Sequence, residues 1–212
     1  MYSVTARGRH EHVAFTSPAP IQVHRGVSMN RFVRAFAIFA AALGISLTTV
    51  QPASANSFGP VFADNGAHSF FLDDDLSSGQ KAGMNWARSS SLNPTDMTTS
   101  LNKTYNKQVD VWAYGTWKPT GDQTRWYAWA KCVKMVSGSK TKCDQYTIVF
   151  NHKLPHSNYK ALACHETGHT VGLGHESGKN SSFTSAARSC LRASPDHNYY
   201  SNHDKSHING RY

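Results

Sequence analysis

The sequence predicts one domain that combines a small β-sheet with several helices, and three observations lead to it. Residues 56–212, which follow an apolar leader, are enough to bury one hydrophobic core. Runs dense in aromatic and β-branched residues, which favour strands, alternate there with segments of helical spacing. No internal repeat or low-complexity tract interrupts this part of the sequence.

The first 55 residues have the composition of an export signal rather than of a folded domain. From Met29, two arginines precede an apolar run over 35–50, which ends at a small-residue site around Ala55. This order is typical of a secretory signal peptide, and the run is shorter than the ~20 residues of a membrane-spanning helix. We therefore interpret 29–55 as a signal peptide cleaved after Ala55, with a retained membrane anchor as the alternative.

Residues 1–28 are rich in His, Arg and Pro and show no periodicity. We interpret them as a disordered or mis-annotated leader, with translation starting at Met29; an extended basic region of the signal is the alternative. The mature domain is then 56–212, a secreted, extracellular protein. We expect it to be a monomer without membrane contact after cleavage.

The charge of the mature part argues against nucleic acid as a partner. The whole chain has 22 Lys and Arg against 13 Asp and Glu; without the five Arg and one Glu of residues 1–55, 17 and 12 remain. The resulting charge of about +5 lies on scattered residues, without a basic stripe interleaved with aromatics. We expect no nucleic-acid partner.

All four cysteines, Cys132, Cys143, Cys164 and Cys190, lie in the mature part. Export would carry them into an oxidising compartment, where disulfides persist. Four cysteines allow three pairings, and we favour Cys132 with Cys143 across a hairpin and Cys164 with Cys190. The absence of a C-x-x-C spacing argues against a zinc site built from cysteine.

Strand and helix signals alternate at the start of the mature domain. A strand is expected over 67–72, and a helix over 79–92, where Ala and Trp recur at helical spacing after carboxylates and hydroxyls that suit a helix start. The three aspartates at 73–75 leave a calcium ion possible but unsupported. A second short helix is expected over 95–105.

Strand signals dominate the next part of the sequence. Alternating residues over 109–114, an aromatic-rich run over 125–134 and the β-branched run 145–150 predict three strands separated by turns. We expect a small sheet with mostly hairpin connections. The tryptophans of this part fit aromatic core and cross-strand pairs better than a ligand groove; they are Trp112, Trp117, Trp126 and Trp129.

The helix expected over 158–173 carries the chemistry. Its end reads HETGHTVGLGH from His165 to His175, which matches H-E-x-x-H-x-x-G-x-x-H at every fixed position. Residues four apart lie about one helical turn from each other, so His165 and His169 can point to one place on one face. Gly172 can take the left-handed conformation that ends a helix, and the chain then turns to bring His175 to the same place.

Three imidazoles around one ion are typical of a catalytic zinc site, because one coordination position is left for water. Glu166, next to the first histidine, is the expected general base. The sequence therefore predicts a zinc-dependent endopeptidase with His165, His169 and His175 as metal ligands. The alternatives are a secreted zinc-holding binding module without turnover and a hydrolase of peptidoglycan peptides.

The stretch 165–175 resembles the zinc signature of the metzincin endopeptidases, and the short segment before the domain resembles small secreted bacterial members, snapalysin-like or matrixin-like. The similarity is looser around Cys164, around Cys190 and in the closing HDKSHING. The resemblance implies an α+β fold with a small twisted sheet, packed helices, a zinc-ligand helix and a short C-terminal subdomain. It also implies one catalytic Zn²⁺ and a protein or peptide substrate.

Two departures from the resembled family bear on the subfamily. Snapalysin has Asp as its third ligand, where this chain has His175. The methionine of the metzincin Met-turn is missing, because no Met follows Met135. Leu191 stands at the expected place and, with a volume close to that of Met, would fill the same apolar floor. A bond between Cys164 and Cys190 would tie the ligand helix to this floor.

Some later side chains could assist the site or serve only the surface. Asp204 and His207 could orient a ligand imidazole or cap the last helix, and surface or capping roles are the favoured interpretation, also for His197 and His203. A phenol from Tyr199 or Tyr200 could stabilise the oxyanion, as a tyrosine of metzincins sometimes does.

Overall fold

The computed structural model describes residues 2–5, 60–175, 188–192 and 195–212, which all belong to one compact unit. The expected signal peptide, the rest of the leader and the segment 176–187 lie outside the described residues. Each helix among the described residues is too short or too polar to cross a membrane.

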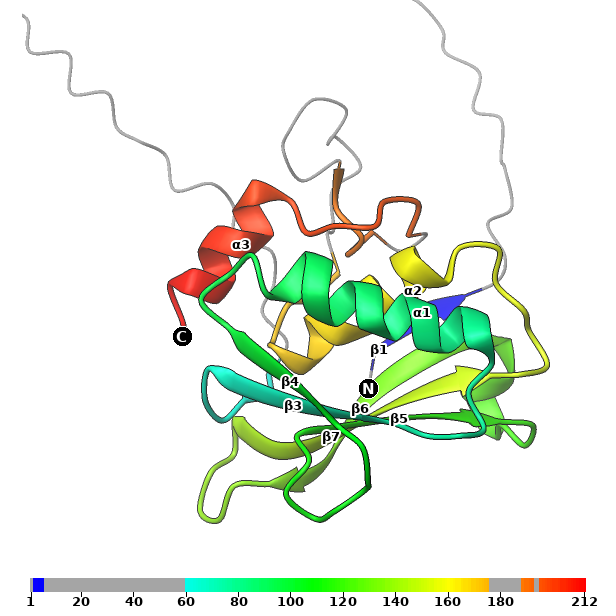
Figure 1. Ribbon diagram of the computed structural model, residues 1–212, viewed down its shortest axis with the longest axis horizontal. Coiled ribbons are helices and arrows are strands. Elements are labelled where there is room, and N and C mark those ends of the chain that lie inside the picture. The colour runs from blue at the N-terminus through cyan, green and yellow to red at the C-terminus, as the bar shows by residue number, and fades with distance from the viewer. Residues whose placement is uncertain (1, 6–59, 176–187, 193–194) are drawn as a thin grey trace, which may run out of the picture. The chain divides into compact units, whose positions relative to one another are not determined.

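A sheet of seven strands underlies the domain (Figure 1). Its order is β1-β6-β7-β5-β3-β4, and β2 pairs with β7 in addition. The strands β3, β4, β5 and β7 are parallel neighbours, whereas β6 runs antiparallel to β7 and β1 antiparallel to β6. Their bounds are β1 Tyr2–Thr5, β2 Phe62–Ala63, β3 Ala67–Leu72, β4 Thr98–Asn102, β5 Val111–Thr116, β6 Trp126–Met135 and β7 Lys142–Asn151.

The expectation of mostly hairpin connections was wrong. Among the described strands, β6 and β7 form the hairpin, and the other pairs of neighbours are joined by crossovers or come from distant segments. The reason lies in β7, which is buried at every position from 145 to 151. A continuous buried run, rather than an alternating one, is typical of a central strand with parallel neighbours.

The helices lie together on one side of the sheet (Figure 1). Ser77 caps the first one in a capping box with Gln80, and the predicted helix over 79–92 is confirmed as an α-helix that continues into a π-helical turn. The bounds are α1 Ser78–Trp86, η1 Ala87–Leu92, η2 Gly121–Arg125, α2 Tyr159–Thr170 and α3 Asn202–Asn209.

The helix expected over 95–105 is not formed; the middle of this segment, Thr98–Asn102, is strand β4. Thr98 pairs with Ala67 and Leu101 with Phe70, so the segment lengthens the sheet beside β3. Threonine has a low helix propensity and a high strand propensity, and tertiary pairing decides such a short segment.

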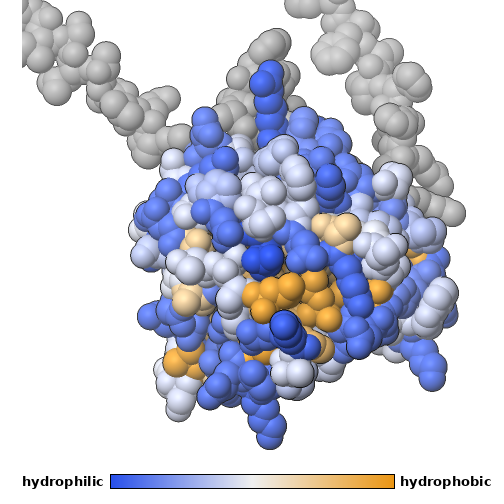
Figure 2. Space-filling view, viewed as in Figure 1, coloured by the Kyte–Doolittle hydropathy of each residue, from blue (hydrophilic) through white to orange (hydrophobic). Residues whose placement is uncertain are grey.

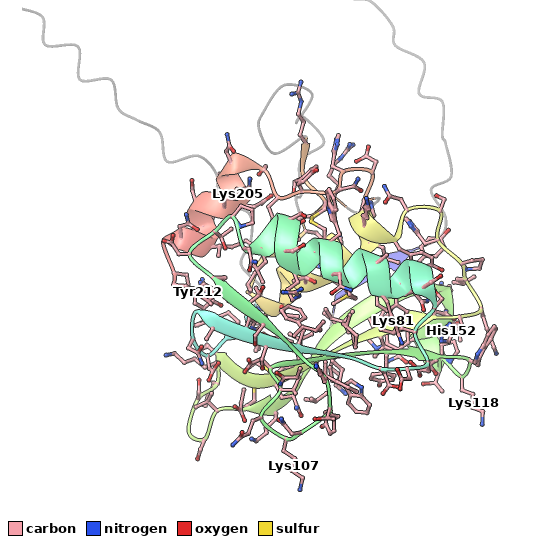
Figure 3. All side chains as sticks on the ribbon, viewed as in Figure 1. Lys81, Lys107, Lys118, His152, Lys205 and Tyr212 are labelled. Atoms are coloured by element: carbon pink, nitrogen blue, oxygen red, sulfur yellow. A yellow bond between two sulfur atoms is a disulfide. The ribbon has the colours of Figure 1, made fainter. Side chains whose placement is uncertain are left out.

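The hydrophobic core fills the space between the sheet and helices α1 and α2. Its largest fully buried apolar side chains are Phe70, Met84, Leu92, Phe150, Ile148, Leu162, Leu173, Leu191 and Ile208. Charged side chains such as Lys107 and Lys118 project from the periphery (Figure 3). The face seen in Figure 2 is largely hydrophilic around a limited apolar patch.

The tryptophans form separate aromatic contacts rather than one groove. Trp112 lies 4.7 Å from Tyr114 between ring centroids, Trp117 stacks on His152 at 5.0 Å, and Trp126 meets Trp129 at 6.4 Å. Two of these pairs lie within a single strand, and of the four tryptophans only Trp129 is buried, so the expected aromatic core and cross-strand pairing is borne out only in part.

Both expected disulfides are present. Cys132–Cys143 links the two strands of the β6–β7 hairpin, and Cys164–Cys190 links α2 to the C-terminal segment. In the segment before α1, Asp73 accepts a hydrogen bond from the Trp112 indole, and Asp75 accepts one from a backbone N–H. These two carboxylates are therefore engaged within the protein. Calcium therefore gains no support among the described residues.

The buried side chain of His68 should make the stability of the folded protein depend on pH. It is buried in β3, with Nε2 2.9 Å from the Thr170 hydroxyl, and burial lowers its pKa to about 4, with Asp64 opposing the shift. Because the folded pKa lies below that of the unfolded chain, this stabilisation is complete above pH ~6.5 and is lost as the pH falls through 4. We expect this residue alone to lower the free energy of unfolding by about 2 kcal/mol between pH ~7.5 and ~5.

Urea unfolding at several pH values measures this effect. The variant His68→Asn, which keeps a polar partner for Thr170 but does not titrate, should show a shallower pH dependence than the wild type. Equal pH dependence in the two proteins would contradict the prediction.

Candidate metal centre

Helix α2 and the turn that follows it place the three motif histidines. Asn158 caps the helix by accepting a hydrogen bond from the N–H of Ala161, and the helix ends at Thr170. Gly172 then has φ 89°, a left-handed conformation that favours glycine. A Cβ at this position would also lie 2.6 Å from the Cβ of Phe62, so the turn requires glycine for two reasons.

The turn brings the three imidazoles of the motif together, as the sequence predicts. Their ring centroids lie 4.6 to 4.9 Å apart, and their donor nitrogens all lie within 4.8 Å of one another. His165 Nε2 and His175 Nε2 lie 3.0 Å apart. Two ligands of a tetrahedral zinc ion stand about 3.4 Å apart, so small side-chain rotations let His165, His169 and His175 share one ion.

Two carbonyl groups orient the first two histidines. The carbonyl of Cys190 lies 2.7 Å from His165 Nδ1, and that of Leu173 lies 2.8 Å from His169 Nδ1. A carbonyl only accepts, so each Nδ1 carries the proton and each Nε2 keeps its lone pair for a metal ion. Such outer contacts fix the tautomer and the ring orientation of metal ligands.

The surroundings keep these imidazoles neutral. Burial lowers the pKa of His165 to about 3, helped by His175, and it lowers the pKa of His169 well below its usual value. Burial also lowers the pKa of the partly exposed His175. Since only neutral imidazole binds a metal ion, the site is prepared for one at neutral pH.

Glu166 lies fully buried beside the first histidine. Burial raises the pKa of its carboxyl group well above the usual value, and the N–H of Ala130 in β6 opposes this only in part. Among the described residues neither carboxylate oxygen has a partner with full hydrogen-bond geometry. A buried carboxylate is costly without compensation, and a cation held by the imidazoles, or water beside it, would supply it. The residues therefore fit a bound metal ion.

Leu191, which is expected to fill the apolar floor of the site, packs against helix α2. Leu191 is fully buried, and a Cβ added at Gly168 would lie 2.9 Å from its side chain, so floor and helix touch where the helix has a glycine. The Cys164–Cys190 disulfide joins the two next to the first histidine. The hydroxyl of Tyr200 donates a hydrogen bond to the carbonyl of Cys164, so it is already engaged with α2.

Asp204 holds this floor from α3. Its Oδ2 accepts hydrogen bonds from the hydroxyls of Ser201, which caps α3, and Ser189, at 2.8 and 2.6 Å. Ser189 in turn accepts from the N–H of Leu191. Capping is therefore the role of Asp204, whereas the contact to Ser189 was not foreseen, because the two residues are neighbours only after folding.

Three other residues fall outside the metal centre. His203 and His207 contact each other on α3, and the half-exposed Tyr199 packs against Trp86 at 5.3 Å between ring centroids.

A cavity of about 290 Å³ adjoins the histidine cluster. It is bounded by His169 on one side and by β6 and β7 on another, and its lining is mainly apolar. Its apolar lining includes Val61, Ala130, Met135 and Tyr146. Sequence reasoning missed this cavity, because segments distant in the chain, from Val61 to His169, enclose it.

No protein-family model matches the chain, and no curated protein matches it. Among solved structures, it is similar to high choriolytic enzyme 1, a hatching enzyme zinc-protease from the medaka fish Oryzias latipes, with 18% identity and a TM-score of 0.32 over 59% of this chain and 54% of that one. It therefore spans about half the length of the hatching enzyme. It is also similar to myroilysin, with 12% identity and a TM-score of 0.43 over 73% of this chain and 91% of that one.

Proposed function

We propose that the chain is a secreted zinc-dependent endopeptidase in which His165, His169 and His175 hold the metal ion and Glu166 acts as the general base. One observation carries this proposal: three neutral imidazoles converge beside a buried carboxyl group. A purely structural zinc site has four protein ligands and gains nothing from a carboxyl group at its side.

The chemistry divides between the ion and the chain. When bound, zinc would supply a Lewis acid that polarises the scissile carbonyl and makes water more acidic. The side chain of Glu166 would take a proton from the attacking water and deliver it to the leaving amine. The carbonyls of Cys190 and Leu173 keep the imidazoles in place during these transfers.

The outer edge of β6 favours an extended peptide as the substrate. Strand β1 pairs with this edge in antiparallel register, Tyr2 opposite Ala130 and Ser3 opposite Trp129, so the edge accepts a further strand. Because the N–H of Ala130 acts on the carboxyl group of Glu166, a chain along this edge passes the proposed base. Main-chain pairing of this kind is a common mode of peptide recognition. The mainly apolar cavity beside His169 would receive a substrate side chain.

Removal of 1–55 as leader and signal would also release β1 from this edge. The two disulfides suit an oxidising compartment outside the cell. We thus propose 56–212 as the mature enzyme, acting as a monomer on protein or peptide substrates.

The variant Glu166→Gln tests the assignment of the general base. Gln has nearly the same shape but cannot take up a proton, so casein hydrolysis should fall by about 10²- to 10⁴-fold while one equivalent of zinc stays bound. His169→Ala should lose both the tightly bound zinc and the activity, as should the wild type treated with a chelator, until Zn²⁺ is restored. Activity that persists in Glu166→Gln and under chelation would refute the mechanism. Zinc binding by a wild type that cleaves no peptide would instead indicate the binding module.

Substrate chirality tests the role of the β6 edge and separates the proposed endopeptidase from a peptidoglycan-peptide hydrolase. Peptidoglycan peptides contain D-residues, which disturb pairing with an L-strand. We expect kcat/KM for an all-L octapeptide to exceed that for the same peptide with D-residues on both sides of the scissile bond by at least about 100-fold, and to exceed that for a blocked tripeptide. Preferential release of muropeptides would contradict this prediction.

The N-terminus of the exported protein tests the assignment of the leader. We expect N-terminal sequencing and intact mass of protein from the culture medium to give a chain that begins at Asn56. A chain that keeps Met29, or one that stays with the membrane fraction, would indicate the retained anchor.

A further inference from the structure

We propose that His203 and His207 form a second binding site for a divalent transition-metal ion, on the surface of α3 and separate from the catalytic centre. The two residues are four apart on one helix, so their side chains lie about one turn from each other. Their Nε2 atoms are 3.1 Å apart, and their ring centroids are 4.4 Å apart at 82° between planes.

This separation is the one that a shared ion requires. With metal–nitrogen distances of 2.0 to 2.1 Å, two ligands stand about 2.9 Å apart at a right angle and about 3.4 Å apart at the tetrahedral angle. The observed 3.1 Å lies between these values and nearly equals the 3.0 Å between His165 and His175 in the first site. Two nitrogens that share one proton would give a similar distance, so the experiment must separate the two explanations.

The charged neighbours of the pair leave room for an ion. Asp204 has its carboxylate engaged with Ser189 and Ser201, and the guanidinium of Arg211 lies over the ring of Phe62 at 4.0 Å. Burial lowers the pKa of His207, helped by His203 and Arg211 and opposed by Asp204, which favours the neutral ligand form. An open cavity of about 390 Å³ beside His207 gives water access to the remaining coordination positions.

The pair should bind more weakly than the first site and prefer ions that accept imidazole. Within the described part of the chain, only the motif histidines bring three donor residues together, so α3 offers a two-nitrogen chelate completed by solvent. The Nδ1 of His203 is buried without a hydrogen-bond partner there, whereas carbonyls hold the Nδ1 atoms of His165 and His169 in the first site. Outer partners of this kind change metal affinity 10- to 100-fold. Zn²⁺, Cu²⁺ and Ni²⁺ suit such ligands.

An ion at this place would stabilise the helix that supports the catalytic floor. It would bridge the first and last turns of α3, next to Asp204, whose hydrogen bond to Ser189 holds the floor at Leu191. A ligand that binds only the folded protein raises its stability by mass action. Millimolar zinc should therefore raise the Tm of the protein already loaded at its first site.

Equilibrium dialysis with Zn²⁺ on the purified mature chain tests the proposal. We expect two equivalents in the wild type, the second at least about 10-fold weaker, and one equivalent in His203→Ala and in His207→Ala. The matched control His197→Ala, which replaces a partly exposed histidine of the same C-terminal segment, should keep both. The variant His169→Ala should lose the tight equivalent and keep the weak one, so failure of this proposal and failure of the proposed function are distinguishable.

Electron paramagnetic resonance of Cu²⁺ added to the protein loaded with one equivalent of zinc identifies the ligands of the second ion directly. Coupling to two imidazole nitrogens, absent from His207→Gln, is the expected result. A single zinc equivalent in the wild type would show that the pair only shares a proton and would overturn the proposal. A second equivalent that persists in both alanine variants would also overturn it.

Discussion

The chain reversal at Gly172 is the constraint on which the rest of the candidate site depends. A straight helix can present two histidines on one face but not a third at the same point. The positive φ of Gly172 ends α2 and directs the chain toward His175. The same reversal places the carbonyl of Leu173 against His169, so one backbone conformation delivers one imidazole and orients another. Phe62, packed over the turn, leaves no space for a side chain larger than hydrogen.

The buried carboxyl group of Glu166 shows why the site must be supported from several sides. A buried polar group without a hydrogen-bond partner favours unfolding or local opening. Here the packing of α2 between the sheet and Leu191 keeps the carboxyl group of Glu166 buried. The disulfide between Cys164 and Cys190 and the contact of Asp204 with Ser189 keep that floor against the helix. The scaffold thus maintains an arrangement that its isolated parts would not adopt.

The chemistry-bearing part of the chain could be predicted from sequence because its determinants are local. Spacing within α2, a glycine at the turn and cysteine placement each have a direct geometric meaning, and the structure has the histidine cluster and both disulfides as expected. The sheet was harder to predict. Parallel neighbours come from distant segments, so β4 looked like a helix and the buried strand β7 looked like part of a hairpin sheet. The contact of Ser189 with Asp204 cannot be predicted from sequence spacing, because it depends on how α3 packs in the folded domain.

The Cys164–Cys190 bridge spans 26 positions in the sequence and encloses the segment between the third histidine and the floor. Its two ends lie directly before the first histidine and directly before Leu191, so the bridge ties the metal-holding helix to its floor. Such a cross-link stabilises a folded chain mainly by restricting the unfolded one. The redox state of the surroundings therefore bears on the metal centre as well as on the stability of the domain.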